Sequence, residues 1–552
     1  MPQDAFTLKR VVSELKETLV GAKITKIIQS DKDSVLFYLY TQKGTFKLIC
    51  STNASNARVC FTKADYPAPQ VAPNFCMLLR KYVAGAIITD FCQIGFERVL
   101  ALSLHCISDF TESDRVLYVE IMGKYSNLIL TENGVILGAL KMTALEENYK
   151  RVLFAGVPYA LPAPQDKINP LSDELPVLLS SFLGGDLGEF LFLNVSGLAR
   201  PTAQMIADGF SGGDLTEHVR GFLFSGETEP CLLYRNGTPV DFFAKRREGA
   251  IPCRSLSEAQ DVLYTAKESA KAFEDQKRKL SSAIRNHKKK EEKKLALLVD
   301  RLRECADSER NRCCGELLTA NLYRIKQGMS SCTVVNYYEE SCPELNIPLD
   351  ETLSPSQNAQ RYFKKYNKQK RTVQAVTPQK EQTERELAYS ESVLSAIERA
   401  ENPVDLAEIE EELIDLGLIK FQGRKRKEVI TPFRVFEIEG FRIVAGRNNK
   451  QNDRLLKSAR AGDLWLHAQK YHSSHVIVFS EGKTVPPSVL LAAAEICARY
   501  SDGNKGGKVA IDYCDRRFVK KPPKSPLGFV LYTDYATILV EPSSHADCEK
   551  NG

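Results

Sequence analysis

Apolar residues at alternating steps of three and four mark a long charged stretch over residues 256–418. This spacing predicts a narrow apolar seam on a helix that faces a partner helix. After Glu291 the seam resumes one position late, a shift that changes the local supercoil without ending the helix. The seam consists of Leu256, Ala259, Leu263, Ala266, Ala270, Phe273, Leu280, Ile284, Leu295, Leu298 and Leu302.

A returning helix is predicted from Leu387 to Leu413, with a break at Pro403. The two helices are expected to form an intramolecular antiparallel coiled coil. If about 70 residues run outward, a rise of ~1.5 Å per residue gives an arm on the order of 100 Å long. The alternative is an ordinary helical bundle folded onto the rest of the chain. The returning seam consists of Leu387, Val393, Leu394, Ile397, Leu406, Ile409 and Leu413.

The two ends of the chain have the alternating pattern of strands. Residues 34–40 and 116–120 predict strands, and residues 75–81 predict an apolar helix that ends in basic residues. Near the other end, residues 436–446 predict a hairpin that turns at Gly440, residues 447–453 a polar loop, and residues 487–500 an amphipathic helix. The ends are therefore expected to be α+β.

Length and composition fit several globular units. The chain has 552 residues, of which 43% are hydrophobic, enough for cores in the terminal units. No leader or apolar run long enough to cross a bilayer is recognisable, so we expect a soluble, cytoplasmic protein without membrane association. The 15 cysteines are scattered and mostly lie in apolar runs. Buried, reduced thiols are expected in preference to disulfides or a metal cage.

Positive charge is concentrated at the carboxy-terminal end. The net charge is +5, but residues 424–552 hold 22 Lys or Arg against 14 Asp or Glu, which is +8 for that segment and −3 for the rest. Such a surface favours contact with a polyanion. A further cluster from Lys277 to Lys290 is equally consistent with a solvated helix face, because Glu291 and Glu292 follow it directly.

A second basic cluster in the arm lies on a helix with a defined start. Ser354 is a predicted N-cap, Pro355 occupies the first helical position, and Gln357 completes a capping box. One face of this helix is aromatic and is expected to pack, with stacking on bases as the less favoured alternative. The other face is free to meet phosphate. It carries Arg361, Lys364, Lys365, Lys368 and Arg371.

Several long segments resemble the NFACT family. Residues 317–325, 336–338 and 353–368 resemble its middle region, and residues 75–81 and 120–127 are similar to its amino-terminal signatures. The acidic–arginine pair with which the family helps to recognise the tRNA anticodon region falls on Glu97 and Arg98, although aspartate is typical at the first position. Taken alone, the two residues indicate a surface ion pair. The resemblance implies tRNA binding by Glu97, Arg98, Glu120, Met122, Lys124 and Asn127.

The resemblance continues to the end of the chain. Residues 192–207 place a Ser-Gly turn between two helices, which fits either a helix-hairpin-helix unit that offers backbone N–H groups to phosphate or a plain helical corner. The family has the former at this position. Residues 446–453, 463–468 and 519–522 are similar to the NFACT RNA-binding domain. His467, His472 and His475 have no common zinc spacing, so no metal is expected. Trp465 is expected in the core, with phosphate contacts by Arg447, Lys457, Lys520 and Lys521.

The fold class that follows is α+β and multidomain, with two α+β globular ends joined by a helix-hairpin-helix unit and a long antiparallel coiled coil. The expected domains are residues 1–172 (NFACT amino-terminal), 173–254 (helix-hairpin-helix), 255–423 (coiled-coil middle) and 424–552 (NFACT RNA-binding).

The resemblance implies a ribosome quality-control factor that is not an enzyme and needs no cofactor. Its expected partners are the large (50S) ribosomal subunit obstructed by a nascent chain on peptidyl-tRNA, and alanyl-tRNA, from which C-terminal alanine tails are made without mRNA. One alternative is an anchorless adhesin with fibronectin as partner. A less favoured alternative is a DNA glycosylase-like enzyme with Pro2 as nucleophile. Gln3 argues against it, because an acidic residue is expected at that position beside the nucleophile.

Overall fold

The structure is a computed structural model that describes residues 3–108, 111–143, 151–420, 432–523, 525–543, 545 and 548–550. The chain divides into two compact units, Met1–Lys271 and Ala272–Gly552, with the division inside a long helix. The predicted basic linker at residues 423–427 and the proposed nucleophile Pro2 lie outside the described residues.

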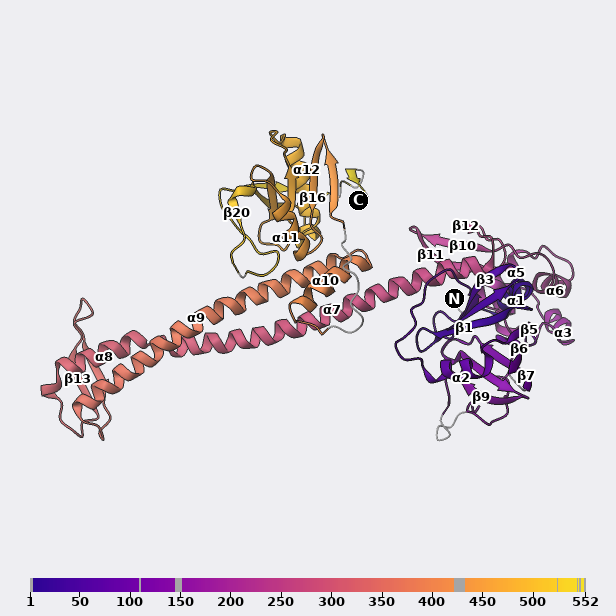
Figure 1. The fold of residues 1–552 in the computed structure, drawn as a ribbon, viewed down its shortest axis with the longest axis horizontal. Coiled ribbons are helices and arrows are strands. Elements are labelled where there is room, and N and C mark those ends of the chain that lie inside the picture. Colours follow the sequence, from indigo (N-terminus) through magenta and orange to yellow (C-terminus); the bar gives the residue numbers. More distant parts are fainter. Residues whose placement is uncertain are drawn as a thin grey trace. The chain divides into compact units, whose positions relative to one another are not determined.

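The first unit is built on a nine-stranded antiparallel sheet with the order β4-β3-β2-β1-β5-β6-β7-β8-β9 (Figure 1). The strands predicted at residues 34–40 and 116–120 are confirmed as β2 and part of β7. The bounds are β1 Lys23–Gln29, β2 Ser34–Thr41, β3 Gly44–Ser51, β4 Arg58–Phe61, β5 Ile87–Gln93, β6 Val99–Ser108, β7 Thr111–Glu120, β8 Asn127–Glu132 and β9 Val135–Ala139.

Two helices pack on this sheet. Helix α1 (Ala5–Leu19) begins at Asp4, whose side chain accepts from the backbone N–H of Thr7, and it packs against β5 and β4. Helix α2 (Asn74–Val83) confirms the predicted apolar helix and contacts β1, β6 and β9. The sheet, both helices and the following helical segment share one apolar core. The first two predicted domains are therefore packed as one body.

The rest of the first unit is a helical segment followed by a small sheet. Two of its helices, α4 and α5, flank the Ser-Gly turn at residues 196–197. The small sheet has the order β11-β10-β12. The bounds are α3 Leu175–Ser180, α4 Leu187–Asn194, α5 Arg200–Asp208, α6 Leu215–Phe224, β10 Cys231–Arg235, β11 Thr238–Phe243 and β12 Ala250–Pro252.

Two long helices pair in the second unit. Helix α7 (Leu256–Glu304) starts in the first unit, and its later part runs antiparallel to α9 (Pro355–Arg399). Lys277 Nζ donates to the Glu398 carbonyl at 2.7 Å, and Lys288 pairs with Glu391 at 2.7 Å. Leu280 and Ile284 pack with residues of α9, as the seam predicts. The two helices thus run antiparallel and share an apolar cluster along part of their length.

The lengths of the two helices differ from the prediction. Helix α7 has 49 residues and ends at Glu304, so at ~1.5 Å per residue it is about 75 Å long, shorter than expected. Helix α9 is one 45-residue helix that starts at the predicted Ser354 capping box and continues through Pro378. The returning helix therefore starts well before Leu387, where the apolar seam first becomes regular.

A small subdomain connects the two helices. It consists of α8 (Ser308–Ala320), the 3-10 turn η2 (Leu322–Arg324) and the hairpin of β13 (Ser331–Val335) and β14 (Glu344–Pro348). Its own apolar core includes Leu317, Val334 and Ile347, together with Ala359 of α9. The start of α9 is therefore packed against this subdomain.

A second antiparallel sheet, with the order β22-β19-β17-β18-β16-β15-β23, forms the carboxy-terminal part. The predicted hairpin at Gly440 and the helix from Pro487 are confirmed, whereas the predicted loop at residues 447–453 is wrong: Asn448 caps α11 there by accepting from Gln451 N–H at 2.8 Å. The bounds are β15 Arg434–Ile438, β16 Phe441–Ala445, α11 Asn449–Ser458, β17 Leu464–Ala468, β18 Val476–Phe479, α12 Pro487–Arg499, β19 Val509–Asp515, β20 Val519–Lys520, β21 Leu531–Tyr532, β22 Ala536–Val540 and β23 Glu549–Lys550.

A buried carboxyl lies where α10 (Pro403–Asp415) packs on α9. Burial raises the pKa of Glu412 to about 7, and its carboxyl accepts from the Tyr389 hydroxyl. Because an unfolded glutamate has a pKa of about 4.3, the stability contributed by the protonated form is complete below that pH and is lost as pH rises to about 7. We therefore expect the free energy of unfolding of the original chain to change between pH 4 and 8 by on the order of 3 kcal/mol more than that of the Glu412→Gln variant.

Urea unfolding followed by the fluorescence of Trp465, the only tryptophan, measures this effect in the second unit. The exposed Glu398 on the end of α9 provides the matched control as Glu398→Gln. Equal pH dependence of the original chain and the Glu412→Gln variant would contradict the assignment.

Candidate nucleic-acid interface

The two segments of the first unit that were predicted to bind tRNA lie side by side. Val99 and Glu120 are paired across β6 and β7, and the backbone N–H of Ile121 donates to the Arg98 carbonyl at 2.9 Å. The β5–β6 turn at residues 94–98 therefore adjoins the β7–β8 loop at residues 121–126. Gly95 and Gly123 have φ of 58° and 59°, a left-handed backbone conformation that favours glycine at both bends.

Glu97 and Arg98 are both half-buried on this turn. Among the residues that the structure describes, neither side chain has a hydrogen bond or ion pair, so the surface ion pair considered above is not formed. Burial raises the pKa of the Glu97 carboxyl, with Arg98 opposing the shift. The guanidinium of Arg98 remains available to a phosphate or a base.

The neighbouring loop presents a cation next to an aromatic ring. Lys124 is exposed, and its Nζ lies 4.9 Å from the centroid of the Tyr125 ring. Tyr125 is 66% exposed, so the ring is free to stack on a base. Met122 is half-buried, and its backbone N–H donates to Ser126 Oγ at 2.8 Å. Tyr125 was missed in the sequence, although its position directly after Lys124 could have indicated it.

Glu120 and Asn127, also predicted to bind tRNA, have structural partners. Glu120 is 1% exposed and receives two hydrogen bonds from Arg151, at 2.6 and 2.9 Å, and one from the Tyr159 hydroxyl at 2.9 Å. The buried Asn127 side chain donates to the Lys141 carbonyl at 2.7 Å and accepts from its N–H at 2.9 Å. Both residues hold the ends of the loop, which is a different role from the direct contact that was predicted.

The Ser-Gly turn of the helical segment supports the β5–β6 turn from within. A Cβ at Gly197 would lie 2.8 Å from both Ala5 Cβ and the Phe96 ring, so only glycine fits. Two nearby N–H groups already have partners: Ser196 donates to the Ile168 carbonyl at 2.8 Å, and Ala199 donates to Asp4 Oδ2 at 3.0 Å. Presentation of these groups to phosphate is therefore not supported, because the turn is packed inside the unit.

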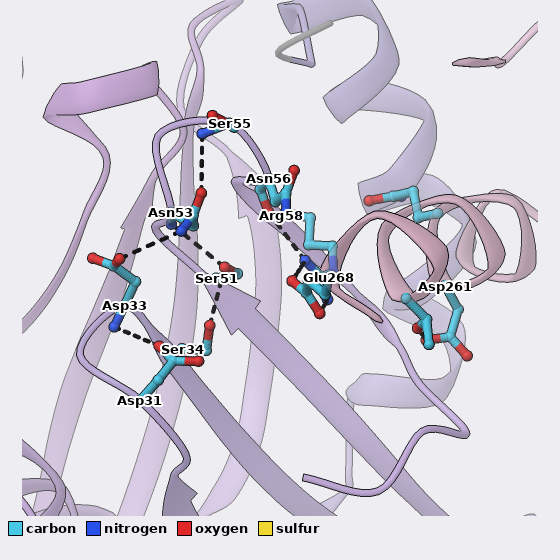
Figure 2. Close-up of polar contacts among 12 residues, drawn as sticks. Asp31, Asp33, Ser34, Ser51, Asn53, Ser55, Asn56, Arg58, Asp261 and Glu268 are labelled. Atoms are coloured by element: carbon cyan, nitrogen blue, oxygen red, sulfur yellow. Dashed lines mark hydrogen bonds and ion pairs between the residues drawn. The ribbon is translucent and has the colours of Figure 1, made fainter. Parts of the chain in front are cut away.

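Polar side chains fasten the neighbouring loops. Lys141 Nζ donates to the Thr52 carbonyl at 2.7 Å and lies 3.2 Å from Asp33, and Asn53 faces Asp33 in Figure 2. The same figure shows Arg58 of β4 against Glu268 of α7, with contacts of 2.6 and 3.0 Å. The start of α7 is thereby fixed to the sheet that bears the β5–β6 turn.

The basic face of α9 is a second candidate surface. Lys364, Lys365 and Lys368 are exposed and have no hydrogen bond or ion pair within the described part of the chain. Arg361 pairs with Asp350 at 3.1 Å, yet its side chain stays 60% exposed. The aromatic face packs as expected, with the Phe363 ring against Gly315 of α8. The three lysines fit contact with phosphate.

The predicted phosphate contacts of the carboxy-terminal part divide into free and paired residues. Lys457 and Lys520 are exposed, whereas Lys521 pairs with Asp453. Arg447 is only 14% exposed, donates to the Pro432 carbonyl at 3.1 Å and lies 3.6 Å from Asp405 of α10. The structure therefore gives Arg447 a docking role between this part and α10, in place of the predicted phosphate contact.

The three histidines do not form a metal cage. His467 and His475 lie with ring centroids 5.5 Å apart, whereas His472 is 3.8 Å from Glu391 of α9. Within the described ranges, no group of three or more His, Cys, Asp or Glu is arranged to hold a metal ion. All 15 cysteines are free, and most are buried, as expected for reduced thiols.

Two family matches cover most of the chain. Residues 4–430 match the NFACT N-terminal and middle domains, and residues 431–530 match the NFACT protein RNA binding domain. The chain belongs to the NFACT family. It is 33% identical over 564 residues to Rqc2 homolog RqcH of Bacillus subtilis, covering 99% of this chain and 98% of the relative. The Streptococcus suis protein of the same name is 33% identical over 556 residues and 98% of each chain.

Two solved structures each match about half of the chain. The N-terminal part of the fibronectin/fibrinogen-binding protein of Streptococcus suis is 29% identical, with a TM-score of 0.43, and covers 48% of this chain and 98% of that one. The C-terminal part is 30% identical, with a TM-score of 0.40, and covers 50% and 96%.

NFACT membership and the RqcH relatives support a function in ribosome quality control, with the ribosome and RNA as partners. An adhesin is suggested only by the names of the solved structures. No helix in the described part of the chain is both long and apolar enough to cross a bilayer.

Proposed function

We propose that this NFACT protein acts in the cytoplasm on large ribosomal subunits that still hold an obstructed peptidyl-tRNA. It recruits alanyl-tRNA, and alanine is added to the stalled chain without mRNA as a signal for degradation. The peptidyl-transferase centre of the ribosome makes the bonds. The protein is not an enzyme in this scheme, because it contributes binding and orientation of the tRNA and no reacting group.

One observation carries the proposal: the β5–β6 turn and the β7–β8 loop lie side by side. Arg98 is half-buried on the turn, and Lys124 and Tyr125 are exposed on the loop. A guanidinium, an ammonium and an exposed ring are the groups that bind a folded, single-stranded RNA loop through phosphate and base faces. Arg151 and Gly197 fix the backbone beneath them. A preorganised surface of this kind lowers the entropy cost of binding.

The coiled coil is proposed to reach a second ribosomal RNA surface through Lys364, Lys365 and Lys368. These side chains extend from a helix whose start is fixed by the Ser354 capping box and the packing of Phe363. A lysine cluster on a rigid helix binds phosphate with little demand for sequence. The exposed Lys457 and Lys520 of the RNA-binding domain are proposed to add contacts of the same kind.

The proposal is tested by fractionation and by RNA sequencing. A tagged chain is expected to sediment with free 50S subunits at low salt and to leave them as salt rises, and the RNA recovered with it is expected to be enriched in alanine tRNA. An exclusively cell-wall location, with binding to immobilised fibronectin, would instead favour the adhesin. Recovery of a different tRNA would change the amino acid and leave the ribosomal role in place.

Reversing the charge of the α9 cluster is expected to weaken ribosome binding. Replacing Lys364, Lys365 and Lys368 together by Glu removes up to three phosphate contacts and adds repulsion. The slope of log affinity against log salt should fall by about 2 to 3, because each contact contributes about 0.7–0.9. Affinity for 50S subunits is measured by sedimentation at several salt concentrations. A matched triple replacement of the exposed Lys279, Lys289 and Lys290 on α7 separates this surface from general charge.

A further inference from the structure

An exposed apolar patch lies on the helical segment of the first unit, where α3 stands at the margin of that unit (Figure 1). Leu183, in the loop between α3 and α4, is 97% exposed, and Leu193 of α4 is 54% exposed. Single exposed leucines are common on protein surfaces. A leucine that is almost completely exposed, however, contributes almost no buried apolar surface to the fold of its own chain. We therefore examined what surrounds it.

The apolar side chains around Leu183 are contiguous. The ring centroids of Phe182 and Phe190 lie 5.0 Å apart, which joins the loop to α4. Phe190 and Leu193 are three residues apart on α4, so they are neighbours on one face of the helix, away from the buried Leu191. Of the four residues, only Phe190 packs against the apolar core of the unit. We refer to Phe182, Leu183, Phe190 and Leu193 as the α4 patch.

Acidic side chains flank the α4 patch. Asp186, the exposed N-cap of α4, lies one helical turn before Phe190. Asp173 and Glu174, which precede α3, are also exposed. Residues 173–224 contain seven Asp or Glu against two Arg and no Lys, which is a net charge of −5. The helical segment is therefore an acidic surface with an exposed apolar patch.

The two arginines of this segment are engaged within the unit. Arg200 pairs with Glu189 at 2.6 Å, and Arg220 donates to the carbonyl of Ser172 at 2.9 Å. Among the residues that the structure describes, the three exposed carboxylates at positions 173, 174 and 186 form no ion pair. Their negative charge is therefore available to a partner.

The charge of the segment selects among the possible occupants of the α4 patch. The phosphate backbone of a nucleic acid would be repelled by the carboxylates. A second copy of the chain in a symmetric dimer would place the same patch against itself, and hence acidic side chains against acidic side chains. A cationic protein segment with apolar side chains meets neither obstacle.

We propose that the α4 patch docks a basic segment of a protein of the large ribosomal subunit. Protein segments that lie on ribosomal RNA are rich in Lys and Arg, because these side chains neutralise phosphate. Apolar side chains of such a segment cover Leu183 and Leu193, and its cations pair with the three exposed carboxylates at the rim. The inference rests on the proposed ribosomal role, and it adds a protein contact to the proposed RNA contacts.

Neutralising the acidic residues distinguishes the occupants by the sign of the effect. Asp173→Asn, Glu174→Gln and Asp186→Asn remove three charges together, and asparagine remains a good N-cap for α4. Affinity for purified 50S subunits is measured by sedimentation. We expect it to fall by about fivefold or more, because up to three ion pairs are lost. Higher affinity would place phosphate opposite the patch, and either that result or unchanged affinity would overturn the proposal.

The matched control has the same change in charge at a different place. It should bind 50S subunits as the original chain does. The control replaces by glutamine three exposed glutamates of the first unit, Glu17, Glu229 and Glu248.

A photoreactive side chain identifies the occupant directly. Benzoylphenylalanine replaces Leu183 in the full chain, and the complex with purified 50S subunits is irradiated. The same replacement of Ile251, which is 58% exposed on β12, is the control. We expect only the probe at Leu183 to crosslink to a ribosomal protein, through a peptide of net positive charge in mass spectrometry. Crosslinks to ribosomal RNA or to a second copy of the chain, or none at all, would overturn the proposal.

Removing the apolar side chains tests the patch without changing charge. Leu183→Ser with Leu193→Ser leaves the core intact and should weaken binding to 50S subunits by about tenfold. If the original chain does not sediment with 50S subunits, the proposed function fails together with this inference. If the original chain sediments and the serine and neutralised variants bind equally well, only this inference is overturned.

Discussion

Replacing Arg98 by alanine is expected to reduce the tRNA recovered with the protein about tenfold to a hundredfold, while binding to 50S subunits stays close to that of the original chain. Arg98 has no intramolecular hydrogen bond or ion pair within the described residues, so its loss should not disturb the turn. A hydrogen bond from a charged group is worth about 1.5–3 kcal/mol, which corresponds to this range of recovery. The measurement is sequencing and quantitation of RNA after purification of the tagged chain.

The control is Arg235→Ala, because Arg235 is an exposed arginine on β10 of the same unit. It should leave tRNA recovery unchanged. If Arg98→Ala and Arg235→Ala recover equal amounts of tRNA, Arg98 has no part in tRNA binding. If Arg98→Ala also releases the protein from 50S subunits, the separation of tRNA and ribosomal surfaces is wrong.

The parts of the fold governed by local pattern could be predicted from the sequence. The seam of Leu280 and Ile284, the capping box at Ser354 and the hairpin at Gly440 all depend on residues a few positions apart. The continuity of α9 could not be predicted, because polar residues dominate its first half and Pro378 reads as a helix breaker. At the start of the helix, packing against the α8 subdomain stabilises a helical conformation that the polar residues there do not predict.

The candidate site was predictable only in outline. The sequence indicated the turn at Arg98 and the loop at Lys124 as candidate binding segments. Their adjacency, however, depends on the register of β6 and β7. Pairings between distant residues were not recoverable: Glu120 with Arg151, and Arg447 with Asp405. Each of these pairs changes an apparent RNA contact into a structural one. A charged residue in a motif therefore has to be checked for a partner before it is assigned to a ligand.

The buried arginine at the base of α7 should have the largest effect on stability. Arg58 is 0% exposed and pairs with Glu268, which is 29% exposed. Removing one partner of a buried pair costs about 3–5 kcal/mol, because the remaining charge is left without compensation. Glu268→Ala should therefore destabilise the first unit by about that amount. Native-state hydrogen exchange of β3 and β4 is the measurement, since a chain with two units does not unfold in one step.

The double variant Arg58→Met with Glu268→Ala separates the loss of a contact from the burial of a charge. Replacing a buried ion pair by apolar side chains of similar volume is often nearly neutral. We therefore expect the double variant to recover at least half of the stability lost in Glu268→Ala. The half-buried Glu258 on the same helix is too close to the helix N-terminus for a matched control, so Lys267→Ala serves, one position before Glu268. If the double variant is less stable than Glu268→Ala, the uncompensated charge is not the cause, and the pair stabilises the base of α7 through its hydrogen bonds.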